Sequence, residues 1–389
     1  MVPTPAASGG RQMSERCADP YGGARAQRRL YIGRSARRVP MSVVHRAGVT
    51  AVSSTQSNLQ PVATHAAARE GVLALPVPFS LQFGGELEKP RLAWRLAGDS
   101  RLPVVLAIGG ISGHRRVFDD TEPRAGWWHE ITGPGRALDS TRCCVLGIDY
   151  LGGSGESSGP PGGDTPLSIS SFDQAEALRH LLDHLQIDRL RAILGASYGG
   201  MVALAFGERY PQRVARLLVI SAADRAHPMA TAWRCVQRRT VRAAQQWGHA
   251  AEGLQLARAL AMTTYRSPEE FVARFDAPAT RVAGRFVFPV EEYLFARGRD
   301  YAVRNRPDSF LCLSESIDLH RVNASSIQVA TTVIAVREDQ LVPIEDMRAL
   351  AARLPDARLH EISSPHGHDA FLKEPGQLRA TFNCIYGEC

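Results

Sequence analysis

Three residue types that together make a nucleophilic catalyst occur along this chain in the order serine, acid, histidine. The serine is Ser197, in the stretch Gly195-Ala196-Ser197-Tyr198-Gly199. An apolar run ends at Leu194, and apolar residues at helical spacing follow from Met201. A G-x-S-x-G pattern between a strand and a helix is typical of a sharp turn that lifts the serine hydroxyl clear of a sheet edge. The pattern therefore predicts Ser197 as a nucleophile.

A serine hydroxyl attacks only when a base removes its proton, and the base needs an acid to orient it. In the expected chain order, both partners follow late strands of the sheet. Asp339 comes after one such run and begins a turn, which favours it over its neighbour Glu338 as the orienting acid. His368 comes after the last strand-like run. It is preferred to His366 as the base because Gly367 permits the turn before it.

Two backbone N–H groups are expected to stabilise the negative oxygen that forms during acyl transfer. One belongs to Tyr198, directly after the nucleophile, and the other to Ile111, in the glycine-rich loop that follows the apolar run 104–108. These are the positions at which such donors lie when the nucleophile sits on a strand–turn–helix.

The elements that must hold these residues alternate between strands and helices. Helical periodicity covers 172–185, 201–210 and 344–354, and the predicted strands are 104–108, 143–148, 190–194, 214–221, 331–336 and 357–362. Alternating strands and helices predict an α/β protein with a doubly wound, mostly parallel sheet. Ligands bind such sheets at the carboxyl ends of the strands, where Ser197, Asp339 and His368 are all expected.

The alternation stops between residues 225 and 325, where helices and loops rich in arginine and alanine replace it. We therefore expect a core formed by residues 71–224 and 326–389, with residues 225–325 inserted as a helical cap, or lid, over the carboxyl edge of the sheet.

The first 70 residues have no sustained apolar period. Residues 1–70 are therefore expected to be a disordered or mis-started N-terminal extension, with order beginning near Val77. Residues 78–83 and 91–96 alternate between polar and apolar on either side of Gly84-Gly85, which predicts a hairpin.

Composition argues against several classes of partner. The formal net charge is +7, but all except two of the 46 basic residues are arginine, and no basic cluster is interleaved with stacking aromatics, so no nucleic-acid partner is expected. No run of 18 apolar residues occurs, so no membrane partner is expected either. The seven cysteines fit neither a disulfide framework nor a metal site, which favours a cytoplasmic protein without metal.

In its motifs and in their order, the chain resembles the homoserine O-acyltransferases of the α/β-hydrolase superfamily. The likeness runs in pieces from about residue 77 to the C-terminus. These pieces include Leu151-Gly152-Gly153-Ser154-Gly155, Arg209-Tyr210-Pro211, Gly253-Leu254-Gln255-Leu256-Ala257-Arg258, Thr264-Tyr265-Arg266-Ser267, Ser316-Ile317-Asp318-Leu319-His320 and Gly367-His368-Asp369-Ala370-Phe371-Leu372. The resemblance implies an α/β-hydrolase fold and transfer of an acyl group to L-homoserine in L-methionine biosynthesis.

The resemblance also implies roles for individual residues. Ser197 is the residue that becomes acylated, and Arg258 and Asp369 hold the carboxylate and amino group of homoserine. Arg238 lines the same part of the cap. The acyl donor is an acyl-CoA, which is a co-substrate, so no cofactor is expected. A homodimer is also expected.

The resemblance leaves two acyl groups open, since members of the family use acetyl-CoA or succinyl-CoA. Succinyl carries an extra carboxylate, and the cap offers cations for it at Arg234, Arg238, Arg239 and Arg242, so succinyl is preferred. Tyr198 stands where the family usually has methionine. Two alternatives stay open, namely an esterase or thioesterase with the same triad, and a serine O-acyltransferase.

Overall fold

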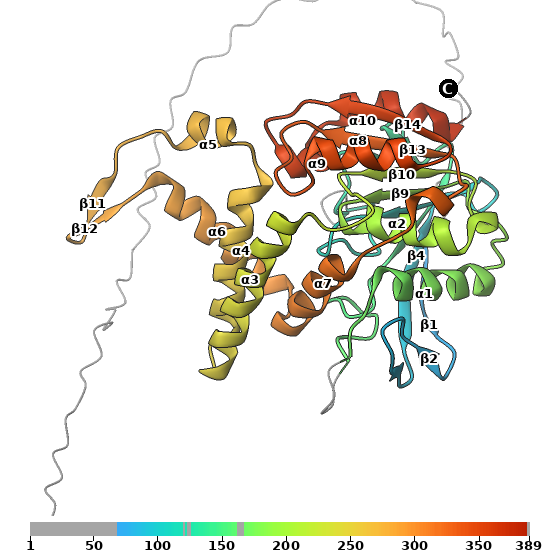
Figure 1. Cartoon of the computed structure of the whole chain (residues 1–389), viewed down its shortest axis with the longest axis horizontal. Helices are drawn as coiled ribbons and strands as arrows, with labels where there is room; N and C mark the ends of the chain where they lie inside the picture. Colours follow the sequence, from blue (N-terminus) through green and yellow to red (C-terminus); the bar gives the residue numbers. More distant parts are fainter. Residues whose placement is uncertain (1–67, 120, 123–125, 162–166, 387–389) are drawn as a thin grey trace, which may run out of the picture. The chain divides into compact units, whose positions relative to one another are not determined.

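The computed structural model describes residues 68–119, 121–122, 126–161 and 167–386, in which an eight-stranded sheet carries the site (Figure 1). Its strands are β1 (Arg69–Ala74), β4 (Arg91–Ala97), β5 (Val104–Ile108), β8 (Cys144–Ile148), β9 (Ala192–Ala196), β10 (Leu217–Ile220), β13 (Thr331–Val336) and β14 (Ala357–Ile362). Their spatial order is β1-β4-β8-β5-β9-β10-β13-β14. The strand β4 runs antiparallel to both neighbours, and all pairs from β8 to β14 are parallel.

The central strands are buried along their whole length. Every residue of β8, β9, β10 and β13 is buried. Strands covered on both faces read as continuous apolar runs, which is why the sequence predicts them well. The edge strand β14 instead alternates between exposed and partly buried residues.

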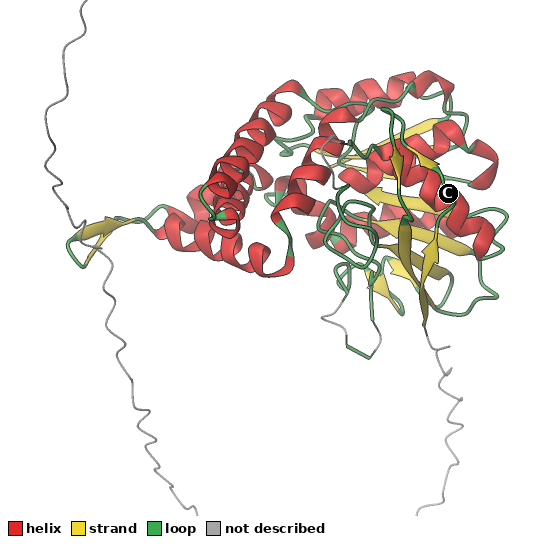
Figure 2. Cartoon of the chain, turned by 90° about the horizontal axis from the view of Figure 1, so that it is seen from below, coloured by secondary structure: helices red, strands yellow, loops and turns green. Residues whose placement is uncertain are grey.

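Helices cover both faces of this sheet (Figure 2). One core cluster contains residues of α1 (Ser171–His184), α2 (Tyr198–Arg209) and α8 (Ile344–Arg353). A second cluster, on other residues of the same strands, contains Trp128 and residues of α9 (Ala370–Lys373) and α10 (Pro375–Phe382). None of the helices in the described part of the chain has the length and apolar character that crossing a bilayer requires.

Five helices lie between β10 and β13. They are α3 (Pro228–Gln246), α4 (Ala250–Tyr265), α5 (Pro268–Phe275), α6 (Pro289–Arg304) and α7 (Pro307–Leu319), with the exposed pair β11 (Thr280–Val282) and β12 (Arg285–Val287) before α6. Four of these helices begin with proline, whose fixed φ suits the first helical position. A small cluster that includes Leu254, Tyr301 and Phe310 packs α4, α6 and α7 together. We refer to these elements as the cap.

The predicted hairpin at 78–96 is wrong in its pairing. The strand β4 pairs with β1, with Ala74 opposite Arg91. The Gly84-Gly85 turn joins only two short strands, β2 (Phe79–Ser80) and β3 (Glu86–Leu87). An edge strand that leaves one face exposed has a weak apolar pattern, and β1 contains no buried residue.

The expected boundary at residue 70 also shifts. Because Arg69 pairs with Leu96, β1 takes in two residues that were assigned to the N-terminal extension. Residues 1–67 of that expected extension lie outside the described residues. Two further short strands, β6 (Thr132–Gly133) and β7 (Leu138–Asp139), pair with each other beside the main sheet.

Candidate active site

Ser197 lies in the turn between β9 and α2, in a backbone conformation that residues other than glycine seldom adopt. Its φ is 55° and its ψ is −123°. A Cβ at Gly195 would collide with the carbonyl oxygen of Gly199, and a Cβ at Gly199 would collide with that of Ile108. Glycine at both positions therefore allows the chain to turn sharply enough to expose the serine hydroxyl.

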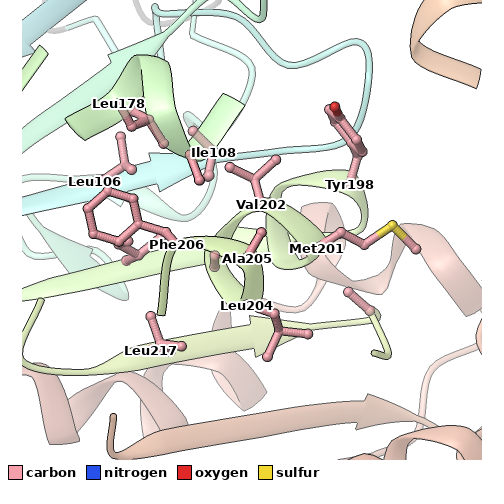
Figure 3. Packing of buried hydrophobic residues seen from close by; sticks show 14 of the residues in the cluster. Leu106, Ile108, Leu178, Tyr198, Met201, Val202, Leu204, Ala205, Phe206 and Leu217 are labelled. Carbon is pink, nitrogen blue, oxygen red and sulfur yellow. The ribbon is translucent and has the colours of Figure 1, made fainter. Parts of the chain in front are cut away.

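The helix after this turn is fixed by its apolar face. Figure 3 shows Val202, Ala205 and Phe206 of α2 among buried residues of the neighbouring strands, such as Leu106 and Leu217. This packing holds the N-terminal end of α2, and therefore Ser197, at a defined place beside the sheet edge.

The three predicted catalytic side chains form one hydrogen-bonded chain. Nε2 of His368 lies 2.8 Å from Oγ of Ser197, and Nδ1 of His368 lies 2.7 Å from Oδ2 of Asp339. The other carboxylate oxygen of Asp339 accepts hydrogen bonds from the N–H groups of Leu341 and Val342 at 2.9 and 3.0 Å. The turn after β13 thus orients Asp339, and Asp339 orients the imidazole.

Glu338 and His366, the alternatives for the acid and the base, are not part of this hydrogen-bonded chain. Glu338 accepts hydrogen bonds from the hydroxyl of Ser363 and the N–H of Ser364. Nδ1 of His366 lies 2.6 Å from Nη1 of Arg266. Neither residue contacts Ser197, so the preference for Asp339 and His368 agrees with the geometry.

The electrostatics of His368 suit a base. Burial acts to lower its pKa, but the Coulomb interaction and hydrogen bond with Asp339 outweigh burial and raise the pKa above its ordinary value. An imidazolium that forms when His368 takes a proton is thereby stabilised next to a carboxylate.

The two predicted oxyanion donors also lie beside Ser197. Tyr198 is the first residue of α2, and Ile111 lines the same cavity as Ser197. Among the hydrogen bonds within the described residues, none comes from the backbone N–H of Ile111 or of Tyr198. Because neither N–H has an acceptor among these residues, both are available to a negatively charged oxygen in the cavity. The Tyr198 ring itself points to the cap, where its hydroxyl lies 2.6 Å from Oγ of Ser316 on α7.

The catalytic cavity has a volume of about 190 Å³ and lies between the sheet edge and the cap. Its lining includes Ser197 and His368 together with Arg258 and Asp369, the residues expected to hold an amino acid. Asp369 also forms an ion pair with Arg266, whose Nη2 lies 3.2 Å from Oδ2 of Asp369.

Arg258 is held by two aromatic rings. Its guanidinium carbon lies 4.7 Å from the ring centroid of Tyr265 and 4.7 Å from that of Tyr301, and Nη1 donates to the hydroxyl of Tyr265 at 3.2 Å. No ion pair of Arg258 occurs within the described residues. Burial acts to lower the pKa of Arg258, whereas Tyr265, Tyr301 and Asp369 raise it above its ordinary value, so the side chain stays charged.

Arg238 lies in the cap, as predicted, but does not line the catalytic cavity with Arg258 and Asp369. Its Nη1 donates to Oδ2 of Asp318 at 2.6 Å and to the carbonyl oxygen of Ser314 at 3.0 Å, and the residue is absent from the lining of the catalytic cavity. The cation that lines the cavity from α3 is Arg234, one helical turn earlier. Arg239 and Arg242, the other two candidates, are exposed.

A second cavity, of about 810 Å³, adjoins the first and shares Ile111, Ser112, Trp127 and Arg258 with it. Its lining includes Arg116 from the core and Arg304 at the end of α6, together with the acids Asp149 and Glu156.

Several residues of this site were missed by sequence reasoning. Tyr301 and Trp127 carry no local signal, because their roles depend on contacts between distant segments. Ser221 could have been found, since it follows β10 directly and lines the catalytic cavity, just as the triad residues follow their strands.

Comparison with known proteins places the chain in a family. A family model described as the alpha/beta hydrolase fold matches residues 103–375. The homoserine O-succinyltransferase of Xanthomonas campestris pv. campestris is 41% identical over 350 residues, covering 90% of this chain and 92% of that protein. The chain belongs to the homoserine O-acyltransferase family.

Relatives of this family differ in their substrates. The serine O-succinyltransferase of Litchfieldella anticariensis is 33% identical, covering 77% of this chain and 93% of that protein. The crystal structure of homoserine O-acetyltransferase from Bacillus anthracis superposes with a TM-score of 0.73 at 17% identity, covering 82% of this chain and 97% of that chain. That likeness concerns the fold alone, so the choice of acyl donor and acceptor must be argued from the site.

Proposed function

We propose that this homoserine O-acyltransferase family member transfers a succinyl group from succinyl-CoA to the hydroxyl of L-homoserine through an ester on Ser197, in L-methionine biosynthesis. The observation that carries the proposal is one small cavity that contains the Ser197–His368 hydrogen bond together with Arg258 and Asp369. An amino acid has one carboxylate and one ammonium group. One cation and one anion beside a nucleophile therefore suit this acceptor.

In the first half-reaction, Nε2 of His368 takes the hydroxyl proton of Ser197 as Oγ attacks the thioester carbonyl. The N–H groups of Ile111 and Tyr198 stabilise the oxyanion, and one such donor is typically worth about 100- to 1,000-fold in rate. The carbon–sulfur bond then breaks, and the leaving thiolate receives the proton from His368. The acyl group remains on Ser197 as an ester.

In the second half-reaction, the γ-hydroxyl of homoserine gives its proton to His368 and attacks the ester. Ser197 leaves and recovers its proton from the imidazolium. Because Arg258 and Asp369 would fix the two charged ends of the acceptor, its hydroxyl would be oriented toward the ester carbonyl.

The two adjoining cavities support an acyl-CoA as the donor. Sites for drug-sized ligands usually measure roughly 300–1,000 Å³, so a cavity of about 190 Å³ takes only the acyl end of a coenzyme. The neighbouring cavity of about 810 Å³ has room for the remainder, and Arg116 and Arg304 on its lining suit phosphate groups.

Two observations support succinyl over acetyl. Arg234 lines the catalytic cavity, where it offers a cation to the free carboxylate of a succinyl group. The relative that is 41% identical is named a homoserine O-succinyltransferase. An acetyl group has no charge that would use this cation.

The test is to incubate the purified protein with succinyl-CoA or acetyl-CoA, together with L-homoserine, L-serine or neither, and to measure thiol release and the acylated product. We expect rapid formation of O-succinylhomoserine with an acceptor present. Without an acceptor, we expect one burst of thiol release as Ser197 is acylated, followed by slow release. Equal thiol release with and without an amino acid would instead identify a thioesterase. Faster use of serine would identify a serine O-acyltransferase.

A further inference from the structure

The carbonyl oxygen of Gly109 joins the nucleophile turn to the glycine-rich loop beside it. Gly109 follows β5 directly, and the loop continues to Ile111, one of the two expected oxyanion donors. The oxygen accepts the N–H of Gly199, in the first turn of α2, at 2.9 Å. A Cβ on Gly110 would lie 3.8 Å from Oγ of Ser197, so the loop passes directly beside the nucleophile. The position of Gly109 therefore decides how this loop meets the reacting atoms.

The same carbonyl oxygen has a second donor, from another strand. The hydroxyl of Tyr150 donates to it at 2.6 Å. Tyr150 is the second residue after β8, which pairs in parallel with β5, so the two strands bring Tyr150 and Gly109 to one edge of the sheet. The residue is buried, and burial raises the pKa of its phenol well above the ordinary value, so the hydroxyl keeps the proton that it donates.

The backbone around Tyr150 is fixed from the other side. The side-chain amide of Gln174, on α1, accepts the N–H of Leu151 at 3.1 Å and donates to the carbonyl oxygen of Leu151 at 2.8 Å. The N–H of Gly153 donates to the carbonyl oxygen of Tyr150 at 3.1 Å. A side chain on a backbone held in this way has little freedom to move, so its hydroxyl can hold Gly109 in one place.

The ring of Tyr150 also contacts the residue that carries the other expected donor. Its centroid lies 5.0 Å from that of the Tyr198 ring, and the two rings meet edge to face at 69°. Tyr150 therefore contacts the loop of Ile111 through its hydroxyl and the nucleophile turn through its ring. Two N–H groups stabilise an oxyanion together only when both lie within about 3 Å of the same oxygen.

We propose that Tyr150 is a positioning residue, which holds the loop of Ile111 against the turn of Tyr198 so that both N–H groups meet one oxyanion. The inference rests on the proposed function, because it concerns the transition state of the same acyl transfer. It extends that function to the glycine-rich segment after β8, which the mechanism does not otherwise use. Because Tyr150 acts through Gly109, it should affect the transition state and not the binding of the substrates.

The test is Tyr150→Phe, which removes the hydroxyl and keeps the ring. Gly109 keeps its other donor, the N–H of Gly199, so the variant should fold. A misplacement of about 1 Å costs on the order of 100-fold in rate, so the thiol burst with succinyl-CoA should slow by about 10- to 100-fold.

Two ligands separate positioning from binding. The inhibition constant of a trifluoromethyl ketone analogue of the acyl-CoA, which forms a tetrahedral adduct on Ser197, should rise by the same factor as the burst slows. The dissociation constant of desulfo-CoA, which forms no adduct, should stay within about twofold of the wild-type value. A purely structural role of Tyr150 would not produce this difference between the two ligands.

Tyr386→Phe is the matched control. The hydroxyl of Tyr386 also bonds the backbone, where it accepts the N–H of Asp139 at 2.7 Å, but Tyr386 lines neither of the two cavities. This variant loses a comparable hydrogen bond and should leave the burst and the affinities for both ligands unchanged.

An unchanged burst in Tyr150→Phe, or a slower burst without a matching rise in the inhibition constant of the ketone, would overturn the inference. An equal loss of affinity for desulfo-CoA would also overturn it, because Tyr150 lines the larger cavity and would then be assigned to the coenzyme. A wild-type protein that forms no ester on Ser197 would contradict the proposed function instead.

Discussion

Replacing Arg258 by methionine should separate the two half-reactions. Methionine keeps much of the length and apolar volume of the arginine stem but removes the charge. In the structure that charge lies between the rings of Tyr265 and Tyr301 and within the catalytic cavity, where no carboxylate of the described residues pairs with it. The charge is therefore available to the carboxylate of the acceptor, and no step proposed for the acylation of Ser197 uses it.

The expected magnitude follows from the loss of one partner of a buried charged pair. That loss costs about 2–5 kcal/mol, which corresponds to roughly a 30- to 4,000-fold lower kcat/KM for homoserine. Each ring contact adds about 0.5–2 kcal/mol to the stability of the cap, so some decrease in melting temperature is expected as well. Arg258→Lys should recover only part of the activity, because lysine keeps the charge without the planar fork.

The assay is a rapid-quench measurement of the thiol burst with succinyl-CoA alone, followed by steady-state kinetics in homoserine. The burst should stay within about twofold of wild type while kcat/KM for homoserine collapses. Arg281→Ala is the control, since Arg281 also lies over an aromatic ring, that of Phe286 at 5.9 Å, but outside the catalytic cavity. Loss of the burst in Arg258→Met would refute the assignment of Arg258 to the acceptor.

Three further outcomes are expected. His368→Ala should abolish the thiol burst and His366→Ala should preserve it, as measured by the same quench assay; equal losses would mean that the wrong histidine was assigned. Asp339→Asn should slow the burst by about 10⁴-fold and should shift the acid side of its pH–rate profile to lower pH. The shift is expected because, without the carboxylate, burial lowers the pKa of His368; a pH series with an unshifted acid side would contradict this. Arg304→Ala should raise KM for succinyl-CoA but not for a succinyl thioester of N-acetylcysteamine, which has no phosphates. Arg299→Ala, on the same helix, should change KM for neither thioester. Equal effects of Arg304→Ala on both thioesters would show that Arg304 does not bind the phosphates.

The sequence was most informative about the parallel part of the sheet. The predicted strands 104–108, 331–336 and 357–362 agree with β5, β13 and β14 residue for residue. The positions of Asp339 and His368 followed from the rule that residues after parallel strands meet at one edge of the sheet. Such features depend on local pattern and chain order, which a sequence contains.

The sequence was least informative about the direction in which a side chain of the cap points. Arg234 and Arg238 are one helical turn apart on α3 and both bond Asp318, yet only Arg234 lines the catalytic cavity. Helical periodicity cannot separate residues at this spacing, because they share a face. The rings around Arg258 come from α4 and α6, and that packing of distant segments leaves no mark in a local pattern.

The order of the elements has a consequence for how this enzyme is made. Ser197 precedes its base by 171 residues, and the whole cap is translated between them. At about 5–20 residues per second, a ribosome needs roughly 10 to 35 s to pass from the nucleophile to the histidine. During this interval the growing chain contains Ser197 but no base to activate it. We therefore expect Ser197 to be unreactive in the unfinished chain, and to become reactive only when β13 and β14 join the sheet and bring Asp339 and His368 beside it.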